Sequence, residues 1–192
     1  MFILDADSIK KATLTKSLLL INILCFIAIN LFLGYTYVLF FSQINYEITI
    51  NGEYWRLFTS MFLHADIIHL ASNMIALLIF GTAVEINYKS KTQYLLIYFI
   101  SGFIGNFFTL ILLPSDTISL GASGAIFGLI GAAFILYVRF DPTLLILSLF
   151  YILYFILASF APGINVIAHL TGLIGGIILG LLFYRKNKDF DY

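Results

Sequence analysis

Long uncharged apolar runs limit what this chain can fold into more than any other feature of its sequence. Six such runs occur, each between 18 and 24 residues long. A helix needs about 20 apolar residues to cross a bilayer, and its backbone groups must be hydrogen-bonded within the segment. The sequence therefore predicts an all-α membrane protein, a bundle of six transmembrane helices at approximately 18–41, 67–84, 94–113, 120–138, 143–160 and 164–184.

The composition agrees with a membrane protein and excludes several other classes. Hydrophobic residues make up 61% of the 192 residues and charged residues 10%, whereas soluble domains are roughly 45–50% apolar and about 25% charged. The length favours a single domain, 1–192. The net charge is zero and no basic block occurs, so we expect no nucleic acid partner. Cys25 is the single cysteine, which leaves no intrachain disulfide.

The positive charges predict the orientation of the six spans. Lys and Arg gather in the cytoplasmic segments of membrane proteins. Nine of the ten Lys and Arg residues fall on one side of the predicted bundle, together with both termini, and Arg56 alone falls on the other. Both termini are therefore expected in the cytoplasm. The nine residues are Lys10, Lys11, Lys16, Lys89, Lys91, Arg139, Arg185, Lys186 and Lys188.

Four polar residues inside the predicted spans share one depth. Asn73, Ser123 and His169 each lie 16 residues before the first Lys or Arg that follows their span. At about 1.5 Å per residue this places them roughly 24 Å from that charge, above the midplane of a hydrocarbon core about 30 Å thick. His69 lies one helical turn from Asn73, towards the outer side and on the same face. The spacing predicts one polar layer that opens outward.

A serine and a histidine in one layer can act as a nucleophile and its general base. Donors such as His69, Asn73 and backbone N–H groups could stabilise the oxyanion of acyl transfer. No Asp or Glu lies in any predicted span, so the pattern favours a dyad over a triad. The same absence argues against an aspartyl protease, and no His-Glu-x-x-His sequence supports a zinc protease. A metal held by the three histidines is disfavoured because His64 and His69 are five residues apart.

Non-chemical interpretations of the same residues remain open. Gly124-x-x-x-Gly128 and the glycines at 172, 176 and 180 have the spacing of close helix packing. A serine in a span often bonds the carbonyl four residues earlier, and Asn73 could join two helices. A small transporter would need inverted repeats or charges at the midplane, and neither is apparent. The shared depth favours chemistry over packing alone.

Four motifs resemble those of the rhomboid family of intramembrane serine proteases. GASG at 121–124 resembles the Gly-x-Ser-Gly nucleophile motif, and AHLTGLIGG at 168–176 resembles Ala-His-x-x-Gly-x-x-x-Gly. HLASN at 69–73 resembles His-x-x-x-Asn, and WR at 55–56 resembles the Trp-Arg pair of the first loop. The order of the motifs along the chain matches the minimal six-helix form of the family.

The resemblance implies a role for each matched residue. Ser123 would be the nucleophile and His169 the general base, with His69, Asn73 and the Ser123 backbone N–H forming the oxyanion hole. Phe127 would pack on His169 and orient it. The supporting residues would be Gly121, Gly124, Gly172 and Gly176 beside the dyad, Trp55 and Arg56 bracing the first loop, and His64.

The resemblance also implies an activity and a location. The expected protein is a protease without metal or cofactor that cleaves transmembrane segments of membrane proteins near the outer face through an acyl-enzyme. It would reside as a multi-pass protein in the lipid bilayer of a prokaryotic cytoplasmic membrane. Independently of the resemblance, the loop 161–163 is a candidate lid because it is short and rich in Gly and Pro. The alternative is a catalytically silent rhomboid-like protein that binds or retains client membrane helices.

Overall fold

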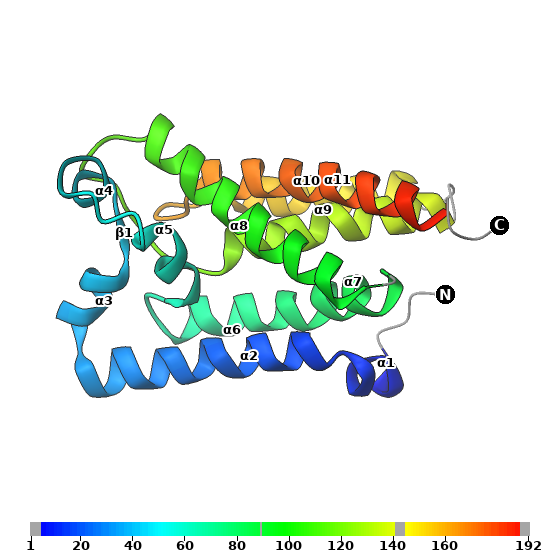
Figure 1. Cartoon of the computed structure of the whole chain (residues 1–192), viewed down its shortest axis with the longest axis horizontal. Coiled ribbons are helices and arrows are strands. Elements are labelled where there is room, and N and C mark those ends of the chain that lie inside the picture. Colours follow the sequence, from blue (N-terminus) through cyan, green and yellow to red (C-terminus); the bar gives the residue numbers. More distant parts are fainter. Residues whose placement is uncertain (1–4, 89, 141–144, 189–192) are drawn as a thin grey trace.

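A computed structural model describes residues 5–88, 90–140 and 145–188 of the chain. Four of its helical segments are long and apolar enough to cross a membrane: Thr13–Leu33, Ile67–Asn87, Lys91–Leu112 and Val166–Tyr184. Two shorter helices, α9 (Ser123–Phe140) and α10 (Leu145–Ala158), belong to the same bundle (Figure 1). The protein is a multi-pass helical membrane protein. The count of six spans stays a prediction, because the start predicted for the fifth, at 143, lies outside the described residues.

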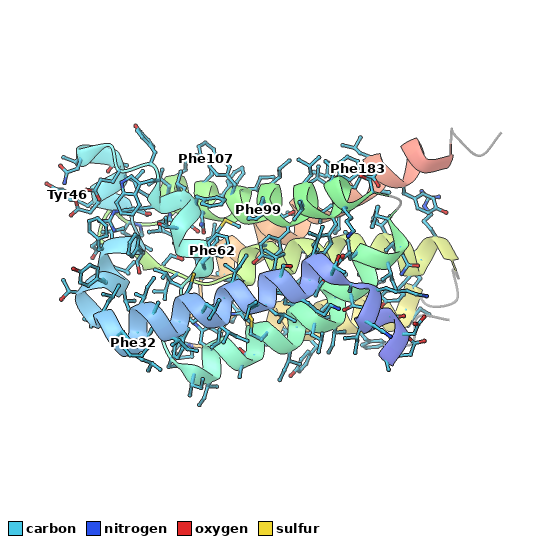
Figure 2. The ribbon with its side chains drawn as sticks, turned by 60° about the horizontal axis from the view of Figure 1, so that its bottom comes forward. Phe32, Tyr46, Phe62, Phe99, Phe107 and Phe183 are labelled. Atoms are coloured by element: carbon cyan, nitrogen blue, oxygen red, sulfur yellow. The ribbon has the colours of Figure 1, made fainter. Side chains whose placement is uncertain are left out.

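Large apolar side chains cover the outside of the bundle. Phe32 and Phe107 point away from it (Figure 2) and are 80% and 42% exposed. Along α10, Phe150, Tyr154 and Leu157 are exposed in the same way. A soluble monomer rarely exposes contiguous apolar surface of this extent. The outer face of the bundle therefore suits contact with lipid chains.

The structure divides the predicted first span, 18–41, into two helices. α1 (Ala6–Lys11) is followed by α2 (Thr13–Phe26), which continues as a π-helical segment, Ile27–Leu33. Gly34 then adopts a φ of +86°, a left-handed value that glycine takes without steric cost. α3 (Tyr35–Phe41) begins after this break as a separate helix. Because the whole run is uncharged, hydropathy alone did not reveal the break.

Short elements form the end of the bundle opposite to α1 and to the end of α11 (Val166–Lys188), as Figure 1 shows. α4 (Asn45–Asn51), α5 (Arg56–Thr59) and the 3-10 turn Ser60–Phe62 follow α3. Between α3 and α4, β1 (Gln43–Ile44) pairs antiparallel with β2 (Ile118–Ser119), so that Gln43 lies opposite Ser119. This pairing ties the first loop to the segment that leads into α9.

The second predicted span, 67–84, runs further than expected. α6 (Ile67–Ala76), the π-helical segment Leu77–Gly81 and α7 (Thr82–Asn87) form one continuous helix. Glu85 therefore lies inside a membrane-spanning helix, which corrects the expectation that no carboxylate does. Its buried carboxylate accepts hydrogen bonds from the backbone N–H groups of Leu14, at 2.9 Å, and Thr15, at 2.7 Å. Glu85 thus caps the start of α2, where Ala12 offers no side-chain cap.

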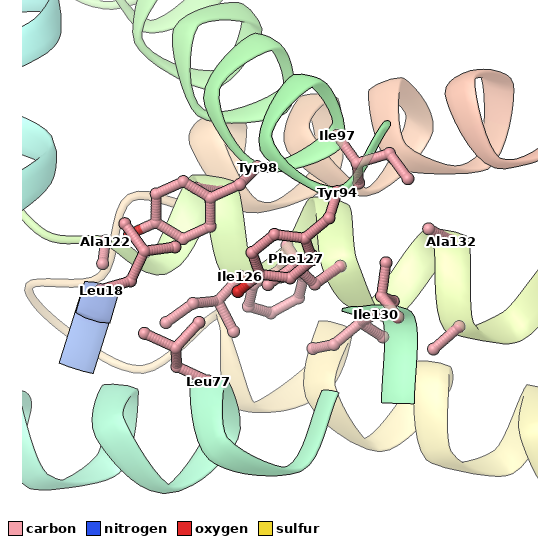
Figure 3. Packing of buried hydrophobic residues seen from close by; sticks show 14 of the residues in the cluster. Leu18, Leu77, Tyr94, Ile97, Tyr98, Ala122, Ile126, Phe127, Ile130 and Ala132 are labelled. Atoms are coloured by element: carbon pink, nitrogen blue, oxygen red, sulfur yellow. The ribbon is translucent and has the colours of Figure 1, made fainter. Parts of the chain in front are cut away.

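The core lies where α8 (Lys91–Leu112) crosses α9. Tyr94 and Tyr98 from α8 pack beside Ile126 and Phe127 from α9, with Leu77 of the second helix below them (Figure 3). All five side chains are buried. This core fixes α9, the helix that begins at Ser123, against the second and third membrane-spanning helices.

The capping contact of Glu85 gives a prediction about stability. In a Glu85→Ala variant two backbone N–H groups of α2 lose their acceptor in a buried position. We expect the free energy of unfolding to fall by about 1–3 kcal/mol. The measurement is denaturation in detergent micelles, followed by circular dichroism. The control is Glu47→Ala, because the Glu47 carboxylate bonds Asn51 at the surface. An equal loss in both variants would contradict the capping role.

Candidate active site

Ser123 is the first helical residue of α9, and its side chain is half-buried. Gly121, two residues earlier, has a φ of +133°, and its backbone N–H donates to the Ser60 carbonyl at 2.9 Å. The chain therefore turns sharply from β2 into α9. The first N–H groups of a helix have no acceptor within it and carry a partial positive charge. Ser123 thus lies beside donors that can bind a developing negative charge.

His169 lies in the first turn of α11, and its imidazole is buried. The ring stacks on Phe127 with centroids 4.1 Å apart and planes 15° apart, as the resemblance implied. Its Nδ1 lies 2.7 Å from Ser159 Oγ. Asn165 caps this helix, since its Oδ1 accepts from the Ala168 N–H at 3.0 Å. The ring is therefore held on one face by an aromatic side chain and at one nitrogen by a hydroxyl.

α9 and α11 approach each other closely beside these two residues. A Cβ added to Gly124 would lie 3.5 Å from the Ala168 carbonyl oxygen. A Cβ on Gly172 would overlap the Gly124 carbonyl, and one on Gly176 would overlap the Gly128 carbonyl. Gly124 follows Ser123, and Ala168 precedes His169, so the contact brings the two predicted catalytic positions to neighbouring places on facing helices.

No hydrogen bond joins Ser123 to His169 within the described part of the chain. Catalytic hydrogen bonds are often long in a protein without substrate and tighten when substrate binds. Ser159 Oγ is the side-chain hydrogen-bond partner of His169 in this structure. A dyad of these two residues would therefore require the Ser123 hydroxyl and His169 Nε2 to come closer when substrate binds.

His69 lies beside the same turn. Asp66 caps α6, because its Oδ1 accepts from the backbone N–H groups of Ile68 and His69, both at 2.8 Å. A Cβ built on Gly121 would lie 3.0 Å from His69 Nε2 and 3.6 Å from Ser123 Oγ. The His69 imidazole and the Ser123 hydroxyl therefore border one glycine, as an oxyanion donor and a nucleophile would.

Asn73 is buried one turn further along α6. Its Nδ2 donates to the His69 carbonyl at 3.2 Å, which holds the amide on the face that carries His69. The hydrogen bond is internal to the helix and leaves one further Nδ2 hydrogen for a ligand. The expected position of Asn73 below His69 is met, while its contribution to an oxyanion hole remains a prediction.

His64 is fully buried in the segment before α6. Its ring lies edge to face with that of His69, with centroids 5.1 Å apart. Burial, and secondarily the neighbouring His69, lowers the pKa of His64 to about 3. His64 therefore adds no positive charge beside His69 at neutral pH. This side chain packs against the predicted oxyanion residue, which suits a supporting role.

Trp55 and Arg56 brace the first loop, as the resemblance implied. The buried guanidinium of Arg56 donates through Nη1 to the carbonyl oxygens of Leu39 and Ser42, each at 2.8 Å. It also lies over the Trp55 ring, 4.8 Å from the centroid. These contacts close the C-terminal end of α3 and do not involve Ser123 or His169.

Sequence reasoning missed Ser159. The residue follows the last residue of α10 and is 2% exposed. A serine at the end of an apolar run usually bonds its own helix, so nothing in the pattern marked it as a partner of His169. Ser159 begins the short connection 159–165, and His169 lies in the first turn of the helix that follows it.

The turn at Gly121 gives a prediction that separates a clash from backbone strain. In Gly121→Ala the new methyl group would crowd the His69 ring, and residue 121 would keep a φ that is unfavourable for alanine. We expect a loss of about 1–3 kcal/mol of unfolding free energy and a displaced ring signal of His69 in ¹⁵N NMR.

The matched control is Gly52→Ala, because Gly52 has a φ of +73° but open space around its Cβ position. Gly52→Ala should lower the free energy of unfolding only by the backbone strain and should leave the ring signal of His69 unchanged. An unmoved His69 signal in Gly121→Ala would show that the ring does not border this glycine.

Comparison with known proteins agrees with the motifs. A family model described as the Rhomboid domain matches residues 51–186. YdcA of Bacillus subtilis (strain 168) is 40% identical over 146 residues, which are 72% of this chain and 71% of YdcA. Rhomboid protease GluP of the same bacterium is 37% identical over 177 residues, 86% of this chain and 34% of GluP.

Rhomboid-like protease 3 of Toxoplasma gondii is 31% identical over 149 residues, 72% of this chain and 55% of that protein. The chain thus spans less than two thirds of the length of GluP and of the Toxoplasma protein. The family model's match, 51–186, includes every motif residue described above. By its helical fold, its motifs and these relatives, the protein belongs to the rhomboid family.

Proposed function

We propose that the protein is an intramembrane serine protease in which Ser123 is the nucleophile and His169 the general base. Relatives that are named rhomboid proteases support proteolysis within the membrane. The observation that carries the dyad is the close contact of α9 with α11, in which the residues next to Ser123 and His169 touch. A buried imidazole beside a half-accessible hydroxyl at a helix start is an arrangement that packing alone does not require.

The reaction follows from these positions. Ser123 Oγ attacks the carbonyl carbon of a peptide bond while its proton passes to Nε2 of His169. The imidazolium gives that proton to the leaving nitrogen, the C–N bond breaks, and an acyl ester remains on Ser123. Water then attacks the ester, with His169 accepting its proton and returning it to Ser123 Oγ as the carboxylate product leaves.

The donors for the oxyanion lie on two elements. His69 borders the turn before Ser123, and Asn73 lies one helical turn further along α6. The backbone N–H of Ser123 is at the start of α9. In many enzymes, hydrogen-bond donors that point at the developing negative charge in a site with little water supply a large share of the rate enhancement. The position of His69 and Ser123 on either side of Gly121 supports acyl transfer over a binding role.

The substrate class follows from the bilayer. With six spans and both termini in the cytoplasm, the end of the bundle that holds β1 and β2 faces outward, and Ser123 lies below it. A transmembrane segment must lose its helical hydrogen bonds before cleavage, so segments with Gly, Pro or polar residues near the outer surface should be cut first. The exposed connection at 161–163, with Gly163 at a φ of +81°, is the proposed lid. The membrane proposed is the cytoplasmic membrane of a prokaryote.

A catalytically silent member of the family is the alternative. Such a protein would hold client helices through the same packing glycines and would not depend on Ser123 or His169. The two proposed functions differ in whether Ser123 is a reactive nucleophile.

The test uses purified protein in liposomes with a model transmembrane substrate. Ser123→Ala and His169→Ala should each lower kcat by at least about 1,000-fold, because the two side chains act as a unit. A fluorophosphonate probe should label the wild-type protein and neither variant. Ser17→Ala is the control, since the exposed Ser17 hydroxyl bonds only the Thr13 carbonyl. Cleavage that persists in Ser123→Ala would overturn the dyad, and absence of labelling in the wild type would favour the silent protein.

A further inference from the structure

Ser159 ends α10 with a hydroxyl that reaches two groups at once. Its Oγ lies 2.8 Å from the Phe155 carbonyl oxygen and 2.7 Å from His169 Nδ1. The Ser159 backbone N–H donates to the carbonyls of Phe155 and Ile156, at 3.1 and 3.0 Å. The side chain is buried, so no solvent competes for the hydroxyl. The hydroxyl is therefore held on a rigid helix end against the ring of His169.

The number of available protons limits the possible directions of the hydrogen bond between Ser159 and His169. A hydroxyl carries one hydrogen, so Ser159 can donate either to the Phe155 carbonyl or to His169 Nδ1. If it donates to the carbonyl, Nδ1 must carry the ring proton, and Nε2 is free to accept. If it donates to Nδ1, the ring proton sits on Nε2, and that nitrogen cannot accept a proton from Ser123.

We propose that Ser159 is a positioning residue that holds His169 in the tautomer needed for general base catalysis. The chain of donors runs from His169 Nδ1–H to Ser159 Oγ, and from the Ser159 hydroxyl to the Phe155 carbonyl. The inference rests on the proposed protease function, because it assigns Nε2 to Ser123. During proton transfer the Nδ1 proton stays in place, and the proton that leaves Ser123 binds Nε2.

Ser159 and Phe127 restrict different motions of the ring. The Phe127 ring stacks on the imidazole and sets its plane. A stacked contact still permits the ring to turn over by half a rotation, which exchanges the places of carbon and nitrogen. The bond to Ser159 removes that freedom, because only Nδ1 can meet the hydroxyl. The Phe155 ring packs edge to face on Phe127, with centroids 6.2 Å apart, so α10 supports both restraints.

A simple helix-capping role is the competing explanation, and the chain contains a matched control for it. Ser42 also follows the last residue of a helix, is buried, and bonds the carbonyl four residues earlier, at Val38, over 2.7 Å. Its side chain has no histidine partner among the hydrogen bonds of the described residues. Ser42→Ala therefore removes the same cap without touching His169.

The kinetic test compares Ser159→Ala, Ser159→Thr and Ser42→Ala. We expect kcat to fall about 10- to 100-fold in Ser159→Ala with KM within twofold, since part of the contribution of the base is lost. Ser159→Thr keeps the hydroxyl and should recover most of kcat, while Ser42→Ala should stay within twofold of wild type. An unchanged kcat in Ser159→Ala would overturn the proposal.

A spectroscopic test reads the tautomer independently of cleavage. The chain has three histidines, so ring ¹⁵N labelling gives a spectrum that can be assigned with His64→Gln and His69→Gln variants. His169 should carry its proton on Nδ1 in the wild type and in Ser123→Ala, and should populate the Nε2–H form in Ser159→Ala. A proton on Nε2 in the wild type, or no change in Ser159→Ala, would overturn the role of Ser159. Failure of the protease itself would appear separately, as cleavage by Ser123→Ala or none by the wild type.

Discussion

The contact between α9 and α11 is the constraint on which the rest of the structure depends. The backbones touch at Gly124 with Gly172 and at Gly128 with Gly176, where a single methyl group would overlap a carbonyl oxygen. Lipid chains are as apolar as the helices, so close packing rather than water exclusion holds such helices together. The same glycines set the separation of the helix ends that carry Ser123 and His169. Packing and the proposed chemistry would therefore both depend on one geometric condition.

Polar side chains fix the ends of several elements of the bundle. Asn165 caps α11 and also donates to Thr109 of α8, at 2.8 Å, and to Ser119 of β2, at 2.9 Å. In a medium without water each unsatisfied polar group is costly, so a side chain that bonds several segments restricts all of them. Arg56 acts in the same way on α3, as Glu85 does on α2. Asn165 and Arg56 thus restrain the end that carries Ser123, although much of it is loop, and Glu85 restrains the opposite end of the bundle (Figure 1).

Hydropathy and spacing were enough to predict the spans at 94–113 and 164–184 and the shared position of His69 with Ser123, and the family resemblance implied the stack of Phe127 on His169. They failed where conformation depends on a single backbone angle or a distant partner. The break at Gly34 lies in an uncharged run, so hydropathy does not mark it. Glu85 lies inside a membrane-spanning helix, where its carboxylate caps the start of α2. Ser159 was missed because its partner lies across a connection whose path the sequence does not specify. The proposed roles of Ser123 and His169 still rest on neighbouring contacts rather than on a bond between them.

A dyad without a carboxylate makes physical sense in this position. An ionised Asp beside His169 would have to be desolvated at a cost of several kcal/mol. The carbonyls at the C-terminal end of a helix carry a partial negative charge, equivalent to about half an elementary charge. Phe155 lies in the last turn of α10, and the Ser159 hydroxyl connects its carbonyl to the imidazole. In the proposed dyad the helix end would therefore orient and stabilise a transient imidazolium, a task that soluble serine proteases give to a carboxylate, without an ionised acidic side chain in the membrane.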